Sequence, residues 1–235
     1  MSCHRIKHSL VFNYEINGVK VKRVSLVRDL GLLFDTKLSF NQHIDYVINK
    51  ARSMLGFIFR FSGEFKDPYT LKCIYCALVR SLLEFSSVIW MPFYKVHVNR
   101  IESIQRKFVN FALRAYNWKR DNSYPKYRDR CKLIELLPLQ IRRINLGLLF
   151  MYDIINCKVD APSIRNMISY NEQIKNLMSE KLLNVEFKRT NYGKYSLITR
   201  MSRYCNKCKC YSKNIPRYTF KKLILNHNCD ITFEY

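Results

Sequence analysis

Glycine and proline are scarce in this sequence, which holds six of each among 235 residues. A low-complexity or linker-rich chain would contain far more of both, together with tracts dominated by one residue type. Hydrophobic residues make up 48% of the chain and aromatic residues 14%. This composition excludes disorder as the default and predicts a folded chain of one or two domains.

Long apolar stretches are missing as well. The sequence has no run of 18 apolar residues and no lipidation motif at either end, so we expect no membrane partner. The first five residues lack the apolar core that a secretory signal needs. The nine cysteines are an odd number scattered through the chain. Together these features predict reduced thiols and an intracellular location, in the nucleus or the cytoplasm.

Clustered acidic residues are also missing. The nine aspartates include no Asp-Asp pair and no Asp-x-Asp spacing. Polymerases and nucleases that use two metal ions need several carboxylates that converge on those ions. The sequence contains no P-loop, no Gly-x-Ser-x-Gly and no His-Glu-x-x-His either. We therefore assign no catalytic residue and expect this chain alone to be inactive as a polymerase.

Basic residues, in contrast, are abundant. The 41 lysines and arginines outnumber the 18 acidic residues and give a net charge of +23. A positive field attracts a polyanion over about 8 Å in physiological salt, so RNA and DNA are the leading partners. A basic protein of unrelated function is the alternative, because charge alone defines no site.

The positive charge is concentrated in two stretches. Residues 188–222 contain eleven basic residues, interleaved tyrosines and no acidic residue, and residues 100–132 contain ten basic and three acidic residues. Cations for phosphates and aromatic rings for unpaired bases are typical of proteins that bind single strands or duplex ends. A solvated basic face with aromatic packing is the alternative. The candidate nucleic-acid contacts in these stretches are Arg106, Lys107, Lys188, Arg189, Arg200, Arg203, Lys221 and Lys222.

Cysteines gather near the C-terminal end, as Cys205-x-x-Cys208-x-Cys210 with His227 and Cys229 further on. Thiolates and imidazole are the ligands that tetrahedral zinc prefers. A structural zinc site usually joins two close pairs of ligands, which this spacing does not provide. We therefore favour a chance group of thiols and assign no metal, with Cys205, Cys208 and Cys210 as weak candidates.

The N-terminal part has the pattern of β-strands. Residues 10–24 alternate around Asn17-Gly18, a dipeptide that suits the positive φ angles of a tight turn, and so predict a β-hairpin. A short apolar run at 30–34 predicts a third, buried strand. A weaker pattern near the other end of the chain predicts a strand at 185–187.

The middle of the chain has the spacing of amphipathic helices. Ser39-x-x-Gln42 predicts a capping box for a first helix that ends near Gly63. Asp67-Pro68 predicts the start of a second helix, which Pro92 stops. The apolar stripe of this second helix is expected to be Leu71, Ile74, Leu78, Leu82 and Phe85.

Further helices are predicted at 101–115, at 141–155 after Pro138, and at 218–225, with a basic loop at 117–128. The predicted fold class is mainly α with a small N-terminal antiparallel β-hairpin or sheet (α+β), in which the helices form a bundle. We expect three segments: 1–37 with the strands, 38–160 with the main helices, and 161–235 as a basic C-terminal region.

Several motifs follow one another in a fixed order along the chain. They are Asn17-Gly18-Val19, residues 27–35 (VRDLGLLFD), Leu38-Ser39-Phe40 with His43-Ile44, residues 78–90 (LVRSLLEFSSVIW), residues 100–108 (RIESIQRKF) and Arg142-Arg143. This order resembles the segment that follows the palm in LINE-type, jockey-like reverse transcriptases of non-LTR retrotransposons. Phe85 stands where that family usually has a tyrosine. The resemblance covers nearly the whole chain and is strongest from Asn17 to Ile155.

The resemblance implies a part of an RNA-directed DNA polymerase. Leu30 and Gly31 would be the primer grip, a turn that places the 3′ end of the primer. The helices from Ser39 onward would form a thumb that holds the primer-template duplex of RNA and DNA. Lys50 and Arg52, on the polar side of the first helix, would contact phosphates.

In that family the catalytic aspartates lie in the palm, upstream of the segments that this chain resembles. We therefore expect no cofactor in this chain, Mg²⁺ only together with the missing palm, and the rest of the reverse transcriptase as a possible partner. A free-standing nucleic-acid-binding protein co-opted from such an element is one alternative, and a non-functional remnant of an element is another.

Overall fold

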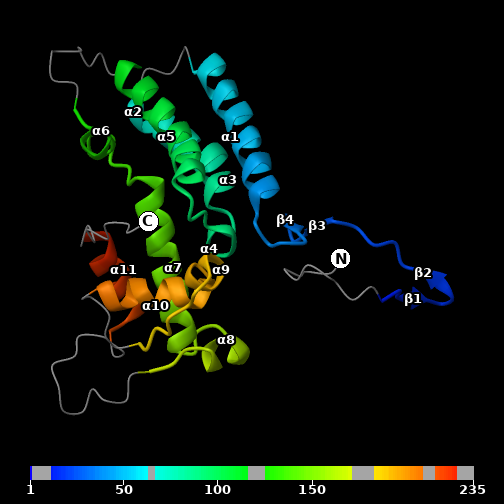
Figure 1. Ribbon diagram of the computed structural model, residues 1–235. Helices are drawn as coiled ribbons and strands as arrows, with labels where there is room; N and C mark the ends of the chain where they lie inside the picture. Colours follow the sequence, from blue (N-terminus) through cyan, green and yellow to red (C-terminus); the bar gives the residue numbers. More distant parts are fainter. Residues whose placement is uncertain (2–11, 63–66, 116–124, 171–182, 209–214, 227–235) are drawn as a thin grey trace, which may run out of the picture. The chain divides into compact units, whose positions relative to one another are not determined.

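The computed structural model describes Met1 and residues 12–62, 67–115, 125–170, 183–208 and 215–226 (Figure 1). The chain divides into two compact units, one made of Met1–Ser86 with Asn99–Tyr124 and the other of Ser87–Val98 with Pro125–Tyr235. Apart from four short strands near the N-terminus, the regular elements of the described ranges are helices. The predicted fold class is confirmed, and the three predicted segments stay a prediction.

A β-hairpin opens the described part of the first unit. β1 (Glu15–Ile16) pairs in antiparallel fashion with β2 (Val19–Lys20). Asn17 and Gly18 form the turn between them, with φ angles of 51° and 77°. The predicted hairpin and its turn are confirmed.

A second hairpin follows directly. β3 (Leu26–Asp29) pairs with β4 (Leu32–Asp35), and the register sets Asp29 opposite Leu32. Leu30 and Gly31 form the turn, with φ angles of 44° and 85°. The strand predicted at 30–34 is therefore wrong in its bounds, because Leu30 and Gly31 are occupied by the turn and pairing resumes only at Leu32.

The first long helix, α1 (Asn41–Phe61), buries one apolar face that includes Ile44, Ile48 and Leu55. The helix is confirmed, but the predicted capping box is wrong. The residue at the N-cap is Phe40, whose φ is 58°, and its side chain makes no capping hydrogen bond. Since Phe40 already occupies the cap position, Ser39 stands one residue too early for the reciprocal bonds of a capping box.

Asp35, at the end of β4, organises the connection to α1. Its carboxylate accepts hydrogen bonds from the backbone amides of Lys37, Ser39 and Phe40 at 2.8 to 3.1 Å and from Ser39 Oγ at 3.0 Å. Partial burial raises the pKa of Asp35, but the hydrogen bonds from Ser39, Lys37 and Phe40 together outweigh burial and lower that pKa below its usual value. One carboxylate therefore fixes the angle at which the hairpin enters the helix.

The second predicted helix consists of three consecutive segments: α2 (Pro68–Tyr75), the π-helix η1 (Cys76–Arg80) and α3 (Ser81–Glu84). Asp67 caps it by accepting hydrogen bonds from the amides of Tyr69 and Thr70, and Pro68 stands in the first turn. Both predicted start signals are confirmed. The helix ends at Glu84, before Pro92, where Phe85 turns to a ψ of 123°.

The buried side of this helix differs from the predicted stripe. Leu71, Tyr75, Val79 and Leu83 are fully buried, whereas Phe85 is 55% exposed. A spacing of four residues drifts about 40° around a regular α-helix at each step. The wider turn of the π segment takes back part of this drift, which keeps the four residues on one side.

The core of the first unit forms where α5 (Lys95–Ala115) joins these helices. The ring of Tyr75 stacks on that of Phe108 with centroids 4.0 Å apart, and its hydroxyl donates to Gln105 Oε1 at 3.2 Å. The rings of Phe59 in α1 and Phe111 in α5 lie 4.4 Å apart. The helix predicted at 101–115 is confirmed and begins earlier than predicted.

The second unit is built around α7 (Leu139–Ile155), which contacts a short helix at 87–90, the helix that follows it in the sequence and two helices from the C-terminal part. A methyl group added to Gly147 of α7 would lie 2.2 Å from the sulfur of Met201, so this glycine permits a close approach of two helices. The other described helices of this unit are α4 (Ser87–Trp90), α6 (Tyr127–Leu133), α8 (Pro162–Asn166), α9 (Asn191–Lys194), α10 (Leu197–Lys207) and α11 (Arg217–Asn226).

Three outcomes follow for the predictions in this unit. The helices predicted at 141–155 and 218–225 are confirmed as α7 and α11. The strand predicted at 185–187 is wrong, since only an isolated bridge between Tyr170 and Leu183 occurs nearby. The helices α6, α8, α9 and α10 were not predicted.

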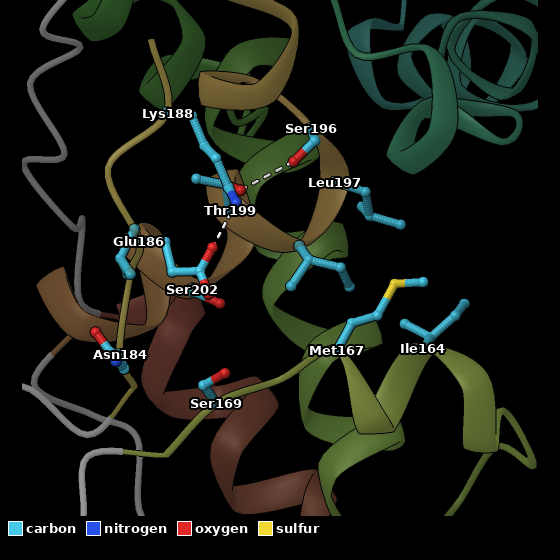
Figure 2. A pocket seen from close by; sticks show the side chains of 12 residues that line it. Ile164, Met167, Ser169, Asn184, Glu186, Lys188, Ser196, Leu197, Thr199 and Ser202 are labelled. Atoms are coloured by element: carbon cyan, nitrogen blue, oxygen red, sulfur yellow. Dashed lines mark hydrogen bonds and ion pairs between the residues drawn. The ribbon is translucent and has the colours of Figure 1, made fainter. Parts of the chain in front are cut away.

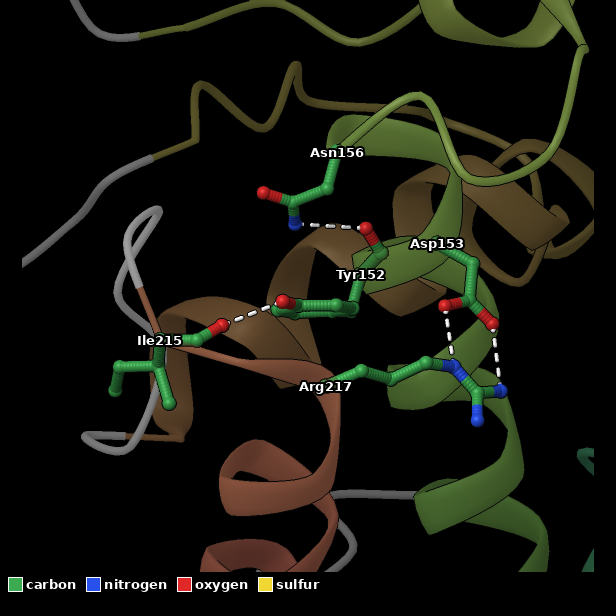
Figure 3. Close-up of polar contacts among 5 residues, drawn as sticks. All are labelled: Tyr152, Asp153, Asn156, Ile215 and Arg217. Atoms are coloured by element: carbon green, nitrogen blue, oxygen red, sulfur yellow. Dashed lines mark hydrogen bonds and ion pairs between the residues drawn. The ribbon is translucent and has the colours of Figure 1, made fainter.

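The helix α11 is fixed to α7 by polar contacts (Figure 3). Arg217 donates two hydrogen bonds to the Asp153 carboxylate, at 2.7 and 2.8 Å. The hydroxyl of Tyr152 donates to the carbonyl of Ile215, and its ring stacks on Phe220 at 4.8 Å. A bidentate arginine–carboxylate pair has a defined geometry, so these contacts set the orientation of α11 on α7.

We expect Asp35→Ala to lower the free energy of unfolding of the first unit by about 1 kcal/mol at neutral pH, because three backbone amides lose their acceptor. Since the pKa of Asp35 is lowered in the folded chain, its contribution is present above about pH 4 and is lost as the pH falls through the folded value. Urea unfolding followed by circular dichroism at neutral pH and at roughly pH 2 measures both effects. Asp29→Ala, at an exposed position of the same hairpin, is the control, and an equal loss in both variants would contradict the assignment.

Candidate nucleic-acid interface

The two predicted phosphate contacts of α1 lie on different flanks of the helix. Lys50 and Arg52 are both exposed, and neither has an ion-pair partner within the described ranges. At 3.6 residues per turn, the side chains of residues two positions apart point in directions that differ by about 200° around the helix axis. The structure therefore does not bring Lys50 and Arg52 together on one surface.

Arg52 belongs to the flank that faces α5. Positions seven apart share a helix face, and the residues seven before and seven after Arg52 both contact α5. Asp45 accepts a hydrogen bond from Arg100 at 2.6 Å, and Phe59 packs against Phe111. Arg52 thus lies beside a helix–helix contact that already includes a paired cation.

Lys50 belongs to the flank of the second hairpin. His43, seven residues earlier, accepts a hydrogen bond on Nδ1 from the amide of Leu33 in β4 at 3.3 Å. Tyr46 lies under the guanidinium of Arg28 in β3, 5.6 Å from the ring centroid. The flank that carries Lys50 is thereby continuous with the hairpin.

Two exposed phenylalanines extend this flank. Phe57 lies seven residues after Lys50, and Phe61 lies four further on. Their rings are 4.4 Å apart and are 41% and 62% exposed. We call Tyr46, Lys50, Phe57 and Phe61 the outer face of α1, and it contains a cation and aromatic rings but no acidic residue.

The sequence analysis gave no role to Phe57 and Phe61. The sequence could have identified them, because the two phenylalanines stand four residues apart on the helix and lie outside its apolar stripe. An aromatic pair in that position covers no core of its own unit.

The predicted primer grip is the tip of the second hairpin. Leu30 is 87% exposed, although its φ of 44° is costly for a residue with a branched side chain. A methyl group added to Gly31 would approach the ring of Phe85 to 3.2 Å. A strained turn with an exposed tip suggests a constraint other than packing.

The outer side of α5 carries the next predicted contacts. Arg106 and Lys107 are exposed, and Arg114, seven residues after Lys107, is exposed as well. Glu102, the only acidic residue of α5, is buried at 5% exposure. This side therefore presents cations without competing carboxylates of its own helix.

The C-terminal contacts divide into three kinds. Arg189, Lys221 and Lys222 are exposed and have no partner among the residues that the structure describes, and Arg203 is half-buried. Tyr218, three residues before Lys221, is 77% exposed on the same helix. Lys188 is ion-paired with Glu186. Lys209 and Lys213 of the basic stretch lie outside the described ranges.

Arg200 does not fit its predicted role. It is 6% exposed and donates hydrogen bonds to the carbonyls of Val88 at 2.8 Å, Met91 at 3.3 Å and Tyr195 at 3.5 Å. Burial lowers the pKa of Arg200 to about 10, and Tyr204 partly offsets this. The guanidinium is thus a buried cation that donates hydrogen bonds to carbonyls around the end of α4. It is not available to a phosphate.

The weak zinc candidates are part of the core of the second unit. Cys205 and Cys208 are each 3% exposed and pack in its apolar cluster. Burial, followed by the neighbouring Cys208, raises the pKa of the Cys205 thiol to about 12, which disfavours the thiolate that zinc needs. Cys210, His227 and Cys229 lie outside the described residues. Within the described part of the chain, no three histidine, cysteine or acidic side chains form a metal-binding group.

Comparisons with known proteins identify no relative. No protein-family model, no curated protein and no solved structure matches this chain. In the parts of the chain that the structure describes, none of the helices has the length and apolar character to cross a bilayer. The resemblance to a reverse transcriptase therefore depends on the sequence motifs alone.

We expect Arg200→Met to lower the free energy of unfolding of the second unit by about 1 to 3 kcal/mol, because buried carbonyls lose their donor. Arg203→Met removes the same charge three residues away and should have little effect on stability. Thermal unfolding followed by circular dichroism compares the two variants. A larger loss in Arg203→Met than in Arg200→Met would contradict the structural role of Arg200.

Proposed function

We propose that this chain binds a nucleic-acid duplex through the outer face of α1 and the turn of the second hairpin. In this proposal it acts as the thumb and downstream region of a non-LTR retrotransposon RNA-directed DNA polymerase. The observation that carries the proposal is the continuity of Lys50, the exposed Phe57–Phe61 pair and the hairpin on one flank of α1.

The chemistry of this flank suits a duplex end. Lys50 offers a phosphate contact that releases counterions. The phenylalanine rings offer faces on which terminal or unpaired bases stack, at about 1 to 3 kcal/mol per base. The turn at Leu30 and Gly31 exposes backbone where a primer end could approach closely.

The proposed role is binding and positioning. This sequence has no closely spaced aspartates that could hold two magnesium ions, so the proposal assigns metal binding and bond formation to another part of the polymerase. The exposed cations of α5 and α11 would add phosphate contacts along the nucleic acid.

A free-standing nucleic-acid-binding protein is the second candidate. The observation in its favour is that each unit has a buried core of its own. The two candidates differ in the preferred ligand. A thumb with a primer grip prefers a recessed primer-template junction, whereas a general binding module treats a junction and a blunt duplex alike.

We expect Lys50→Ala to weaken binding to a primer-template duplex and to reduce the slope of log K against log salt by about one, because one phosphate contact is lost. Arg52→Ala is the matched control, since it removes the same charge from the same helix on the opposite flank. Fluorescence anisotropy over a range of salt concentrations measures both slopes. Equal changes in the two variants, or no change in either, would remove the outer face of α1 from the proposal.

We expect the double variant Phe57→Ala/Phe61→Ala to weaken binding to a recessed junction about tenfold while leaving the salt slope unchanged, because stacking involves no counterion release. Its effect on a blunt duplex should be smaller. Tyr69→Ala, which removes another exposed ring of the first unit, is the control. A loss that is the same on junction and blunt duplex would favour the general binding module.

A further inference from the structure

A pocket of about 480 Å³ lies in the second unit at the start of α10 (Figure 2). Its walls come from α8 and the residues after it, from the segment at 184–188, and from the first two turns of α10. The volume falls in the range of small-molecule sites, roughly 300 to 1,000 Å³. None of the roles described above uses this pocket.

The start of α10 presents unused donors to the pocket. The first amides of a helix have no acceptor within the helix, and here they belong to Leu197, Ile198 and Thr199. Ser196 at the N-cap accepts no capping hydrogen bond from them, and its hydroxyl donates to Thr199 Oγ1 at 2.9 Å. The first turn of α10 has no acidic residue, so the positive end of an eleven-residue helix opens into the pocket.

Ser202 is a second, independent feature. It lines the pocket, is 3% exposed, and its hydroxyl has no hydrogen-bond partner in the described part of the chain. The residue is almost fully buried, so a polar atom of a ligand in the pocket can supply the hydrogen bond that its hydroxyl lacks among the described residues. Ser202 lies five residues beyond Leu197, or about 7.5 Å along the helix axis. One ligand that contacts both places must therefore carry two separate polar groups.

The remaining walls define the rest of the ligand. Ile164 and Met167 give the pocket an apolar side, and Met167 is 66% exposed there. At the polar side Lys188 is ion-paired with Glu186, so the charges of the two side chains cancel. The attraction for an anion then comes from the helix amides, which suits one phosphate better than a highly charged group.

We propose that this pocket binds one nucleotide, with the phosphate on the first amides of α10, a sugar hydroxyl at Ser202, and the base against Ile164 and Met167. The nucleotide is either free or part of a single strand of RNA. The proposal does not rest on the duplex-binding surface of the first unit, and its variants leave that surface unchanged.

The test uses the full chain and isothermal titration with inorganic phosphate, adenosine monophosphate and a short single-stranded RNA. We expect Ser196→Asp to weaken nucleotide or RNA binding about tenfold or more, because its carboxylate takes the position of the phosphate on the amides. Aspartate is a favourable N-cap residue, so this variant should fold at least as stably as the natural chain. Thr219→Asp makes the same charge change in the first turn of α11, away from the pocket, and should have little effect.

Ser202→Ala separates the two polar contacts. It should weaken binding of the nucleotide about fivefold and leave binding of inorganic phosphate unchanged, since the hydroxyl is assigned to the sugar. Saturable binding of adenosine monophosphate identifies the free nucleotide as the ligand, and binding of RNA alone, lost in Ser196→Asp, identifies a nucleotide within a strand. Absence of binding by both ligands, or binding that Ser196→Asp and Thr219→Asp weaken equally, would overturn the proposal. So would a nucleotide that binds no better than inorganic phosphate.

Discussion

The two long helices of the first unit, α1 and α5, each bury only one face, and this constraint governs the arrangement of that unit. The chain carries 41 basic residues, and an unpaired cation is costly to bury, so the cations must leave the buried faces. In α1 and α5 they occupy the outer sides, while the rings of Tyr75, Phe108 and Phe111 fill the space between the helices. The basic surfaces follow from the same separation of apolar and charged residues that forms the cores.

Two buried cations depart from this separation and show what burial requires. Arg200 is tolerated inside the second unit because backbone carbonyls accept its hydrogen bonds. Arg143 is 3% exposed, with its guanidinium 4.8 Å from the ring centroid of Trp90. A third cation, Arg217, is exposed but is already paired with the carboxylate of Asp153. Net charge therefore overstates the number of cations that a nucleic acid could contact.

Local strain and unused polar groups point to function more directly than charge does. The left-handed backbone of Leu30 holds an apolar side chain in water, which folding alone does not favour. Ser202 and the first amides of α10 face a pocket without a partner among the described residues. Each of these two features would be explained by a ligand that contacts it.

The sequence by itself determined the elements whose signals are local. The Asn17-Gly18 turn, the Asp67-Pro68 helix start and the helices at 101–115 and 141–155 depend on φ preferences, caps and periodicity within a few residues. Only the tertiary structure decided which cations are available. Lys50 and Arg52 are distinguished by the neighbours of α1, with the second hairpin on one flank and α5 on the other, and Arg200 is buried by carbonyls more than a hundred residues away in the sequence. The pocket at α10 is likewise formed by segments that are distant in the chain. Periodicity in the sequence reflects only local structure and therefore does not predict such contacts.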